Sequence, residues 1–370
     1  MRKIAVALLF GFLIVGILSL ATGQMPSILP MSPITQSVIF QKNVTVLGSG
    51  GNVARKTTAA LNYTIGSGGD YATIEAAVAA LPDFIDHTIT LTILKGTTIT
   101  SDPDLSGLRG IGTLKIEPEV YLPKPPVYTI PTADSAGSTY LQDAPIFTVD
   151  DKYNNCWILI INGTGTNNGF VSIIDTVALT NRIIVTAWPG TQPDATSKYI
   201  IVGAIFGDVG TSNGFTLNNI DIGVYFSGVG FAGGSYAGIY ADHIKYLSLY
   251  WCGFYGLPYD GLYVDRSQMF YTFYCGFIGN NTENDSYCGG LHVFNCQLAA
   301  IGYNYIQGNL RRGIYLEENS YAEINANVGT NNGTWGTYAI DGSVARHSGT
   351  KCSGSSGDYS NGAGDGSIAY

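Results

Sequence analysis

Short stretches of alternating apolar and polar residues recur at a regular interval along the second half of the chain. They begin at Gly214, Gly238, Gly261, Gly290, Gly313 and Thr337, so the period is 23 or 24 residues with one longer step of 29. Alternation with a period of two is typical of a strand that is buried on one face. A repeat of about two dozen residues predicts a stack of equivalent coils.

Successive side chains of a strand point to opposite faces, so each stretch predicts two inward and two outward positions. The inward columns would be almost wholly apolar: Phe215, Ile239, Leu262, Leu291, Ile314 and Tyr338, and Leu217, Ala241, Val264, Val293, Leu316 and Ile340. The outward columns would be Thr216, Tyr240, Tyr263, His292, Tyr315 and Ala339, and Asn218, Asp242, Asp265, Phe294, Glu317 and Asp341. The pattern therefore predicts a face that carries aromatic rings beside a file of carboxylates.

The period favours an all-β fold, a single-stranded parallel β-helix. A second stretch keeps the same phase, because the run Trp251–Phe254 precedes the similar run Tyr274–Phe277 by 23 residues. The one long step contains the polar segment 280–286, which we expect to bulge from a corner as a loop. A leucine-rich repeat has a comparable period, but its leucine frame is absent.

A short helix is predicted ahead of the repeats, where it would cover the open end of the core. Its apolar residues have helical spacing, Asp70 is placed to cap its start and Pro82 to end it. The segment 66–82 resembles the entrance of the pectin-lyase-like right-handed parallel β-helix superfamily, in the versions found in secreted carbohydrate esterases and lyases and in viral appendage proteins. The resemblance implies the fold and its right hand. It transfers no catalytic residue, since the polygalacturonase, pectinesterase and pectate-lyase signatures are absent.

The sequence divides into four expected parts. Residues 1–23 have the layout of a secretory signal, with Arg2 and Lys3 ahead of an uncharged apolar run, and a retained membrane anchor is the alternative. A tether and leading segment would follow at 24–65, the β-helix at 66–342, and a Gly- and Ser-rich tail at 343–370. These features predict a secreted or cell-surface protein.

The charge balance bears on the partners. The formal net charge is −9 and no basic patch is visible, which argues against a nucleic-acid partner. A polyanionic partner would need a bridging cation, so calcium is the one cofactor that we consider, and no metal ligands are predicted. The expected partner is instead an extracellular polysaccharide or surface glycan. Sequons, which fit a secreted glycoprotein, start at Asn43, Asn62, Asn162, Asn280, Asn284 and Asn332.

The six cysteines form no Cys-x-x-Cys pair, which gives no support to a zinc or redox site. Cys252 and Cys275 share a phase of the repeat, and Cys288 and Cys296 flank the end of the inserted loop. Each pair is compatible with a disulfide or with buried thiols, and the sequence does not decide between the two.

Two chemistries are open to the predicted outer face. Asp242, Asp265 and Glu317 are the candidate catalytic acids, because carboxylates one or two coils apart would be about 5 to 10 Å apart, as glycoside hydrolysis requires. Tyr240, Tyr263, His292 and Tyr315 are the candidate glycan-binding residues, since such rings can stack on sugars. Structural alternatives exist for both sets. Acids at the end of a strand often hydrogen-bond to the following turn, and Tyr is common on any exposed sheet face because of its strand preference. A lone His is usually an ordinary surface residue.

The leading hypothesis is an exported β-helix that presents this face for glycan binding or surface attachment. The first alternative is a carbohydrate-active enzyme, a polysaccharide lyase or glycoside hydrolase, that uses the acids. The second is a structural subunit of an envelope or appendage, which the chain would build as a homo-oligomer.

Overall fold

The computed structural model describes residues 44–47, 54–122, 129–207, 213–233, 236–361 and 368–369. The expected signal or anchor, most of the tether and the sequon at Asn43 lie outside these residues. In the part of the chain that is described, no helix is both long and apolar enough to span a membrane.

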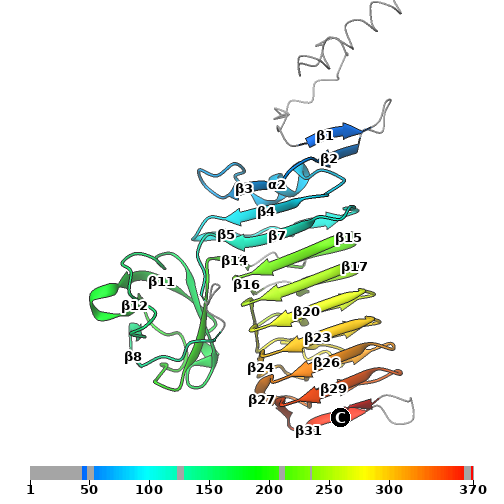
Figure 1. Cartoon of the computed structure of the whole chain (residues 1–370). Helices are drawn as coiled ribbons and strands as arrows, with labels where there is room; N and C mark the ends of the chain where they lie inside the picture. The colour runs from blue at the N-terminus through cyan, green and yellow to red at the C-terminus, as the bar shows by residue number, and fades with distance from the viewer. Residues whose placement is uncertain are drawn as a thin grey trace, which may run out of the picture. The chain divides into compact units, whose positions relative to one another are not determined.

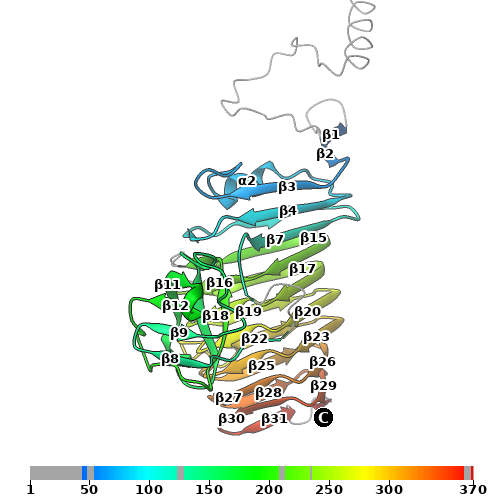
Figure 2. The same ribbon diagram turned by 60° about the vertical axis from the view of Figure 1, so that its left-hand side comes forward.

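The fold is an all-β parallel β-helix (Figures 1 and 2). A coil is built from three strands, and each strand pairs in parallel with its equivalent in the next coil. The strands of the stack are β3 (Leu61–Ile65), β4 (Thr88–Ile93), β5 (Thr97–Ile99), β6 (Asp104–Ser106), β7 (Thr113–Pro118), β14 (Ala204–Gly207), β15 (Phe215–Ser227), β16 (Val229–Ala232), β17 (Ala237–Tyr250), β18 (Gly253–Tyr255), β19 (Asp260–Asp265), β20 (Met269–Phe273), β21 (Gly276–Ile278), β22 (Gly289–Phe294), β23 (Leu298–Gly302), β24 (Tyr305–Gln307), β25 (Arg312–Glu317), β26 (Tyr321–Asn325), β27 (Val328–Asn332), β28 (Trp335–Ala339), β29 (Val344–Ser348), β30 (Lys351–Gly354), β31 (Gly357–Asn361) and β32 (Ile368–Ala369).

Left-handed residues form the corners of the coils, and they stack in columns. The first corner has φ between +46° and +55° at Asn219, His243, Arg266, Asn295, Glu318 and Asp341. The second consists of Gly228, Trp251, Tyr274, Tyr303, Ala326 and Gly349, and the third of Gly233, Gly256, Gly279, Gly308 and Asn331. A single left-handed residue turns the chain sharply between two extended strands. Three such turns and three strands account for the period of 23 residues.

The predicted apolar columns form the core as far as β25, and their side chains are fully buried. The last predicted coil is wrong by one residue. Ile314 pairs with Thr337, so Thr337 and Ala339 take the inward places and Tyr338 lies outward beside Tyr315. The coil starts at Gly336, which packs over Gly313 as the earlier glycines do, and not at Thr337. Asp341 consequently belongs to the first corner and not to the acid file.

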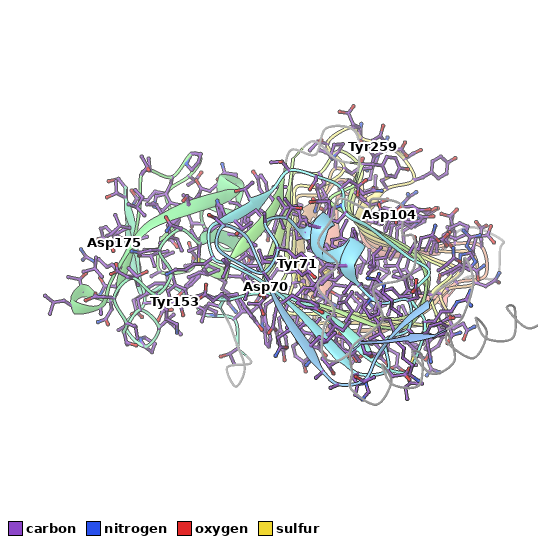
Figure 3. All side chains as sticks on the ribbon, turned by 90° about the horizontal axis from the view of Figure 1, so that it is seen from above. Asp70, Tyr71, Asp104, Tyr153, Asp175 and Tyr259 are labelled. Atoms are coloured by element: carbon purple, nitrogen blue, oxygen red, sulfur yellow. The ribbon has the colours of Figure 1, made fainter. Side chains whose placement is uncertain are left out.

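The predicted helix is α2 (Ile74–Ala80), and it buries Ile74 and Ala77 at the end of the core. Its cap differs from the prediction. The Thr73 hydroxyl accepts a hydrogen bond from the Ala76 amide, whereas the Asp70 carboxylate accepts from the amide and hydroxyl of Thr64. Figure 3 looks down on this end of the stack and labels Asp70.

A separate antiparallel sheet is inserted between β7 and β14 (Figure 1). The continuous apolar runs at 157–162 and 198–202 are its β10 and β13, whereas the repeat pattern gives no indication of the sheet as a whole. Its elements are β8 (Ser135–Gly137), β9 (Tyr140–Gln142), β10 (Trp157–Asn162), η1 (Thr166–Asn168), β11 (Phe170–Val177), η2 (Ala178–Thr180), β12 (Arg182–Val185) and β13 (Lys198–Val202). It has its own core, and the Lys198 ammonium donates to the Tyr305 hydroxyl of the stack at 3.0 Å.

The stack starts and ends beyond the expected limits. β3 pairs with β4 ahead of residue 66, and β29, β30 and β31 pair with the coil before them after residue 342. The buried residues there include Ala345 and Cys352, which are small and give a weak apolar signal. A short hairpin of β1 (Val44–Leu47) and β2 (Ala54–Thr57) precedes the stack.

The cysteines and two of the sequons lie inside the protein. All six cysteines are buried free thiols, so the described residues contain none of the considered disulfides. Asn280 and Asn332 are buried on either side of Asn309, where their amides hydrogen-bond to one another in a ladder. Neither can accept a glycan in the folded protein, whereas Asn62 and Asn284 are exposed.

Candidate functional site

The predicted aromatic residues do form one column. Tyr240, Tyr263, His292 and Tyr315 pair in register on four consecutive coils, and Tyr338 extends the column. The rings of Tyr240 and Tyr263 stack with centroids 5.1 Å apart and an interplanar angle of 7°. Rings that stack along the coil axis cover one another's faces. A ring inside the column therefore offers its edge and hydroxyl to a ligand.

The column is buried in its middle and partly accessible at both ends, where Tyr240, Tyr263 and Tyr338 are half-buried. In the middle, His292 is 5% exposed and Tyr315 is fully buried. The expectation that His292 is a surface residue is wrong. The guanidinium of Arg312 lies 4.1 Å from the Tyr315 ring and 4.4 Å from the Tyr338 ring, and it covers the lower part of the column.

The acid file begins with a pair of aspartates that share one arginine. Asp242 and Asp265 are neighbours on adjacent coils. Nη2 of Arg266 lies 3.1 Å from Oδ1 of Asp242 and 2.8 Å from Oδ2 of Asp265. The His243 Nδ1 lies 2.6 Å from the same Oδ1 of Asp242. Asp242 is therefore held by two basic groups at the first corner.

Asp265 differs from its neighbour because it is almost completely buried. Burial raises the pKa of Asp265, and the adjacent Arg266 offsets only part of this effect. Its Oδ1 is buried and has no hydrogen-bond partner among the described residues. Such surroundings shift the equilibrium of a carboxyl group toward its protonated form.

Glu317 lies apart from this pair and belongs to a buried cluster. His292 lies between two carboxylates, with Nδ1 3.4 Å from Asp260 and Nε2 3.3 Å from Glu317. Burial alone would lower the pKa of His292, but the carboxylates of Asp260 and Glu317 raise it. Burial would raise the pKa of Glu317, but the hydrogen bond and the charge of the adjacent His292 lower it. The cluster is a largely buried network of ionic groups. The three candidate acids Asp242, Asp265 and Glu317 therefore do not form one site.

Asp260 was not predicted as part of this cluster. It is 1% exposed and accepts a hydrogen bond from the Gly289 amide at 2.7 Å. The signal in the sequence is weak, since Asp260 stands immediately before the glycine that opens its repeat and lies outside the alternating positions.

A groove follows the first corner next to Asp242. Its volume is about 560 Å³, and most of the residues that line it have polar side chains: Gly107, Arg109, Asn219, Asp221, His243, Ile244, Lys245, Arg266 and Gln268. Basic residues gather here although the chain is acidic overall. The sequence pattern missed the groove because its side chains come from corner residues and from loops, and not from the alternating strand positions. The described residues contain no group of three or more His, Cys, Asp or Glu side chains placed to hold a metal ion.

The fold and this surface define a parallel β-helix protein with a polar groove at one corner of its coils. No family model and no curated protein matches the chain. Three solved structures with some likeness to it are phage tailspikes. They include gp49 of Pseudomonas phage LKA1, with a TM-score of 0.22 and 9% identity over 79% of this chain and 52% of that one.

Two further tailspikes show a similar degree of likeness. Gp61 of Pseudomonas phage phi297 has a TM-score of 0.18 and 12% identity over 75% of this chain and 44% of that one. Gp54 of Acinetobacter baumannii bacteriophage AP22, solved with an A. baumannii capsular saccharide, has a TM-score of 0.19 and 9% identity over 74% and 60%. The chain thus spans about half the length of these proteins. Values this low assign neither a site nor a function.

Proposed function

We propose that this protein binds a glycan outside the cell, in the groove at the first corner and against the neighbouring Tyr240. The observation that supports the proposal best is the groove itself. The amides, guanidinium and ammonium groups and the Asp221 carboxylate that line it offer both donors and acceptors to a ligand. A polyhydroxylated chain uses both kinds of group, and pockets of this size commonly bind ligands.

Tyr240 is the ring that can add a stacking contact. It begins the aromatic column, because the coil before it carries Thr216 at the paired position. One face of Tyr240 is covered by Tyr263, and the opposite face meets the small Thr216 side chain. A sugar ring can pack on that face and contact Asp242, two residues along the same strand. Tyr263 has one face against Tyr240 and meets the His292 ring edge to face, with centroids 4.8 Å apart and an interplanar angle of 87°.

A secreted or surface location belongs to the same proposal. It is supported by the basic and apolar residues at positions 2–20, which have the pattern of an export signal. A glycan ligand fits such a location because polysaccharides cover the surfaces of many cells.

Binding should be tested on an array of bacterial, archaeal and eukaryotic glycans, with Ca²⁺ and with EDTA. We expect at least one polysaccharide to bind the wild type, and Tyr240→Ala or Lys245→Ala to weaken that binding about tenfold or more, which corresponds to about 1.4 kcal/mol. Tyr271→Ala is the matched control, since Tyr271 is a half-buried ring on another face. The proposal fails if no glycan binds, or if Tyr240→Ala and Lys245→Ala both bind as tightly as the wild type.

Hydrolysis is the second candidate function, and one observation favours it. Asp265 is an acid with a raised pKa on the coil next to the carboxylate of Asp242, a combination used by glycosidases. Against it, Arg266 engages both groups and Asp265 is 5% exposed. If the protein shortens any polysaccharide that it binds, and Asp265→Asn stops this without reducing binding, the enzymatic function is the correct one.

A further inference from the structure

A second hollow lies on a different face of the stack, formed by the outer surfaces of β7, β15 and β17. Its volume is about 310 Å³, and it is lined by Lys115, Ile116, Glu117, Tyr121, Tyr225, Ser227, Tyr250 and Trp251. None of these residues lines the groove at the first corner. The two sites are therefore separate.

The hollow exists because one ring is missing from a ladder. Ser227 pairs with Tyr250, and Tyr250 pairs with Phe273, so the three side chains occupy equivalent positions on consecutive coils. The Tyr250 and Phe273 rings stack with centroids 5.7 Å apart and an interplanar angle of 19°. Ser227 places a hydroxymethyl group where the next two coils carry rings. The space that a ring would fill is left open to solvent.

The missing ring exposes an aromatic face. Inside a ladder each ring is covered on both sides, but Tyr250 is covered by Phe273 on one side, and the preceding coil carries only Ser227 at the paired position. The Trp251 ring lies beside Tyr250, tilted by 46° with centroids 5.7 Å apart. Tyr225 also borders the hollow: its ring lies against that of Tyr246 with centroids 5.2 Å apart and a tilt of 36°, and the strand before it carries Lys115 at the paired position. Two phenol rings thus present an uncovered face or edge to the same hollow.

The back of the hollow is a rigid aromatic wall. Tyr121 and Trp251 are 4% and 3% exposed, and their ring centroids lie 6.3 Å apart. Tyr121 fits there because the second-corner residue of this coil is a glycine, Gly228. A Cβ on Gly228 would lie 2.1 Å from Cγ of Tyr121. The pocket is therefore shaped by packed side chains and needs no rearrangement to receive a ligand.

Polar groups surround the ring faces. The Lys115 ammonium and the Glu117 carboxylate stand at the rim, and neither forms an ion pair within the described residues. Ser227 supplies a hydroxyl on the floor, hydrogen-bonded to Tyr121. A ligand that suits this lining has an apolar face for the rings and hydroxyl groups around its edge for the acid, the amine and the serine.

We propose that this hollow binds one pyranose unit of an uncharged saccharide. The C–H face of the sugar packs on Tyr250, and its equatorial hydroxyls bind Glu117, Ser227 and Lys115. The volume accommodates a single ring and not a longer stretch of chain. The site is an additional saccharide site, and it stands whether or not the groove at the first corner binds a glycan.

The test uses saturation-transfer NMR on the whole protein with methyl β-D-glucopyranoside, methyl β-D-galactopyranoside and methyl α-D-mannopyranoside. At least one glycoside should receive saturation at its ring C–H protons in a concentration-dependent way. Ser227→Tyr should reduce that signal tenfold or more, because it continues the ladder and fills the hollow. Ser348→Tyr is the matched control, since Ser348 lies in the same column at the far end of the stack and should bind as the wild type does.

Further variants separate folding and the other site from this one. Tyr250→Ala removes the exposed ring face and should also abolish the signal, which decides the matter if Ser227→Tyr is unstable. Tyr240→Ala removes the ring beside the groove at the first corner, and the part of the glycoside signal that Ser227→Tyr abolishes should persist in this variant. The inference is overturned if none of the three glycosides binds the wild type, if Ser227→Tyr folds and binds normally, or if Tyr240→Ala is the variant that loses the signal.

Discussion

The buried cluster around His292 makes a demanding test of the structure. In His292→Leu the imidazole is replaced by an apolar side chain of similar size, which leaves the carboxylates of Asp260 and Glu317 without the group between them. Asp260 is 1% exposed, and the Glu317 side chain is 17% exposed. Removing one partner of a buried ionic network typically costs about 3 to 5 kcal/mol, because the remaining charges stay out of water.

The exposed histidine provides the matched control. His243 also pairs with an aspartate, but its side chain is 46% exposed. Exposed ion pairs contribute about 0 to 1 kcal/mol, so His243→Leu should change the free energy of unfolding by no more than that. Urea denaturation followed by far-UV circular dichroism measures both values. Equal effects of the two substitutions would refute the argument, since it depends on burial and not on the number of charges.

The pH dependence of the same cluster has a definite sign. His292 has a folded pKa above its ordinary value of 6.5, so its contribution to stability is fully present below pH 6.5 and is lost as pH rises through the folded pKa. Glu317 has a folded pKa below 4.5, so its contribution is present above pH 4.5 and is lost as pH falls through the folded pKa. The difference in stability between wild type and His292→Leu should therefore be largest between pH 4.5 and 6.5. A difference that is constant from pH 3 to 9 would contradict the ionic assignment.

Three further outcomes are expected, each measured by urea or thermal unfolding. Asn309→Ala, in the middle of the buried amide ladder, should cost about 2 to 4 kcal/mol by leaving polar groups unpaired; an effect as small as that of Asn284→Ala would contradict this. Ala326→Gly, at φ +51°, should stabilise the protein by up to about 1 kcal/mol, whereas Ala300→Gly within a strand should destabilise it. Because the folded pKa of Asp265 is raised, the wild type should lose stability as pH rises from 3.8 through that pKa. Asp265→Asn should not show this loss.

The repeat could be read from the sequence because its strongest signal is local. Each coil carries alternating apolar residues after a glycine, and the glycine is needed where the next coil passes closely. A Cβ on Gly261, for example, would lie 2.4 Å from the Gly290 carbonyl oxygen. The start of the last coil was predicted one residue too late because this signal is only local. Both Gly336 and Thr337 precede an alternating run, and only the contact with Gly313 shows which residue starts the coil.

The inserted sheet and the end of the stack illustrate the limit of periodicity. β10 and β13 have continuous apolar runs and could be predicted as strands, but their antiparallel partners have irregular spacing. After residue 342 the inward residues are small, so the core continues although the alternation of apolar and polar residues in the sequence is weak. In both places pairing between distant segments, which a local pattern does not contain, determines the structure.

The candidate site was only partly predictable, since an outward position in a strand need not be an exposed one. His292 and Tyr315 have the predicted direction, but neighbouring rings and Arg312 cover them. The partner of His292 on the other side, Asp260, lies outside the repeat pattern. Burial in an outward column depends on the size of the side chains in the coils above and below, and these become neighbours only after folding.

The stacking of coils also determines where an aromatic side chain can bind a sugar. In a ladder with rings about 5 Å apart, every interior ring has both faces covered, so the number of rings does not increase the stacking surface. Only a ring next to a small residue has a free face. Tyr240 follows Thr216 and Tyr250 follows Ser227, and both pairs join β15 to β17. Both proposed saccharide sites therefore lie where the coil that contains β17 stacks on the coil that contains β15. The two sites are on different faces of the stack, separated by the corner at His243.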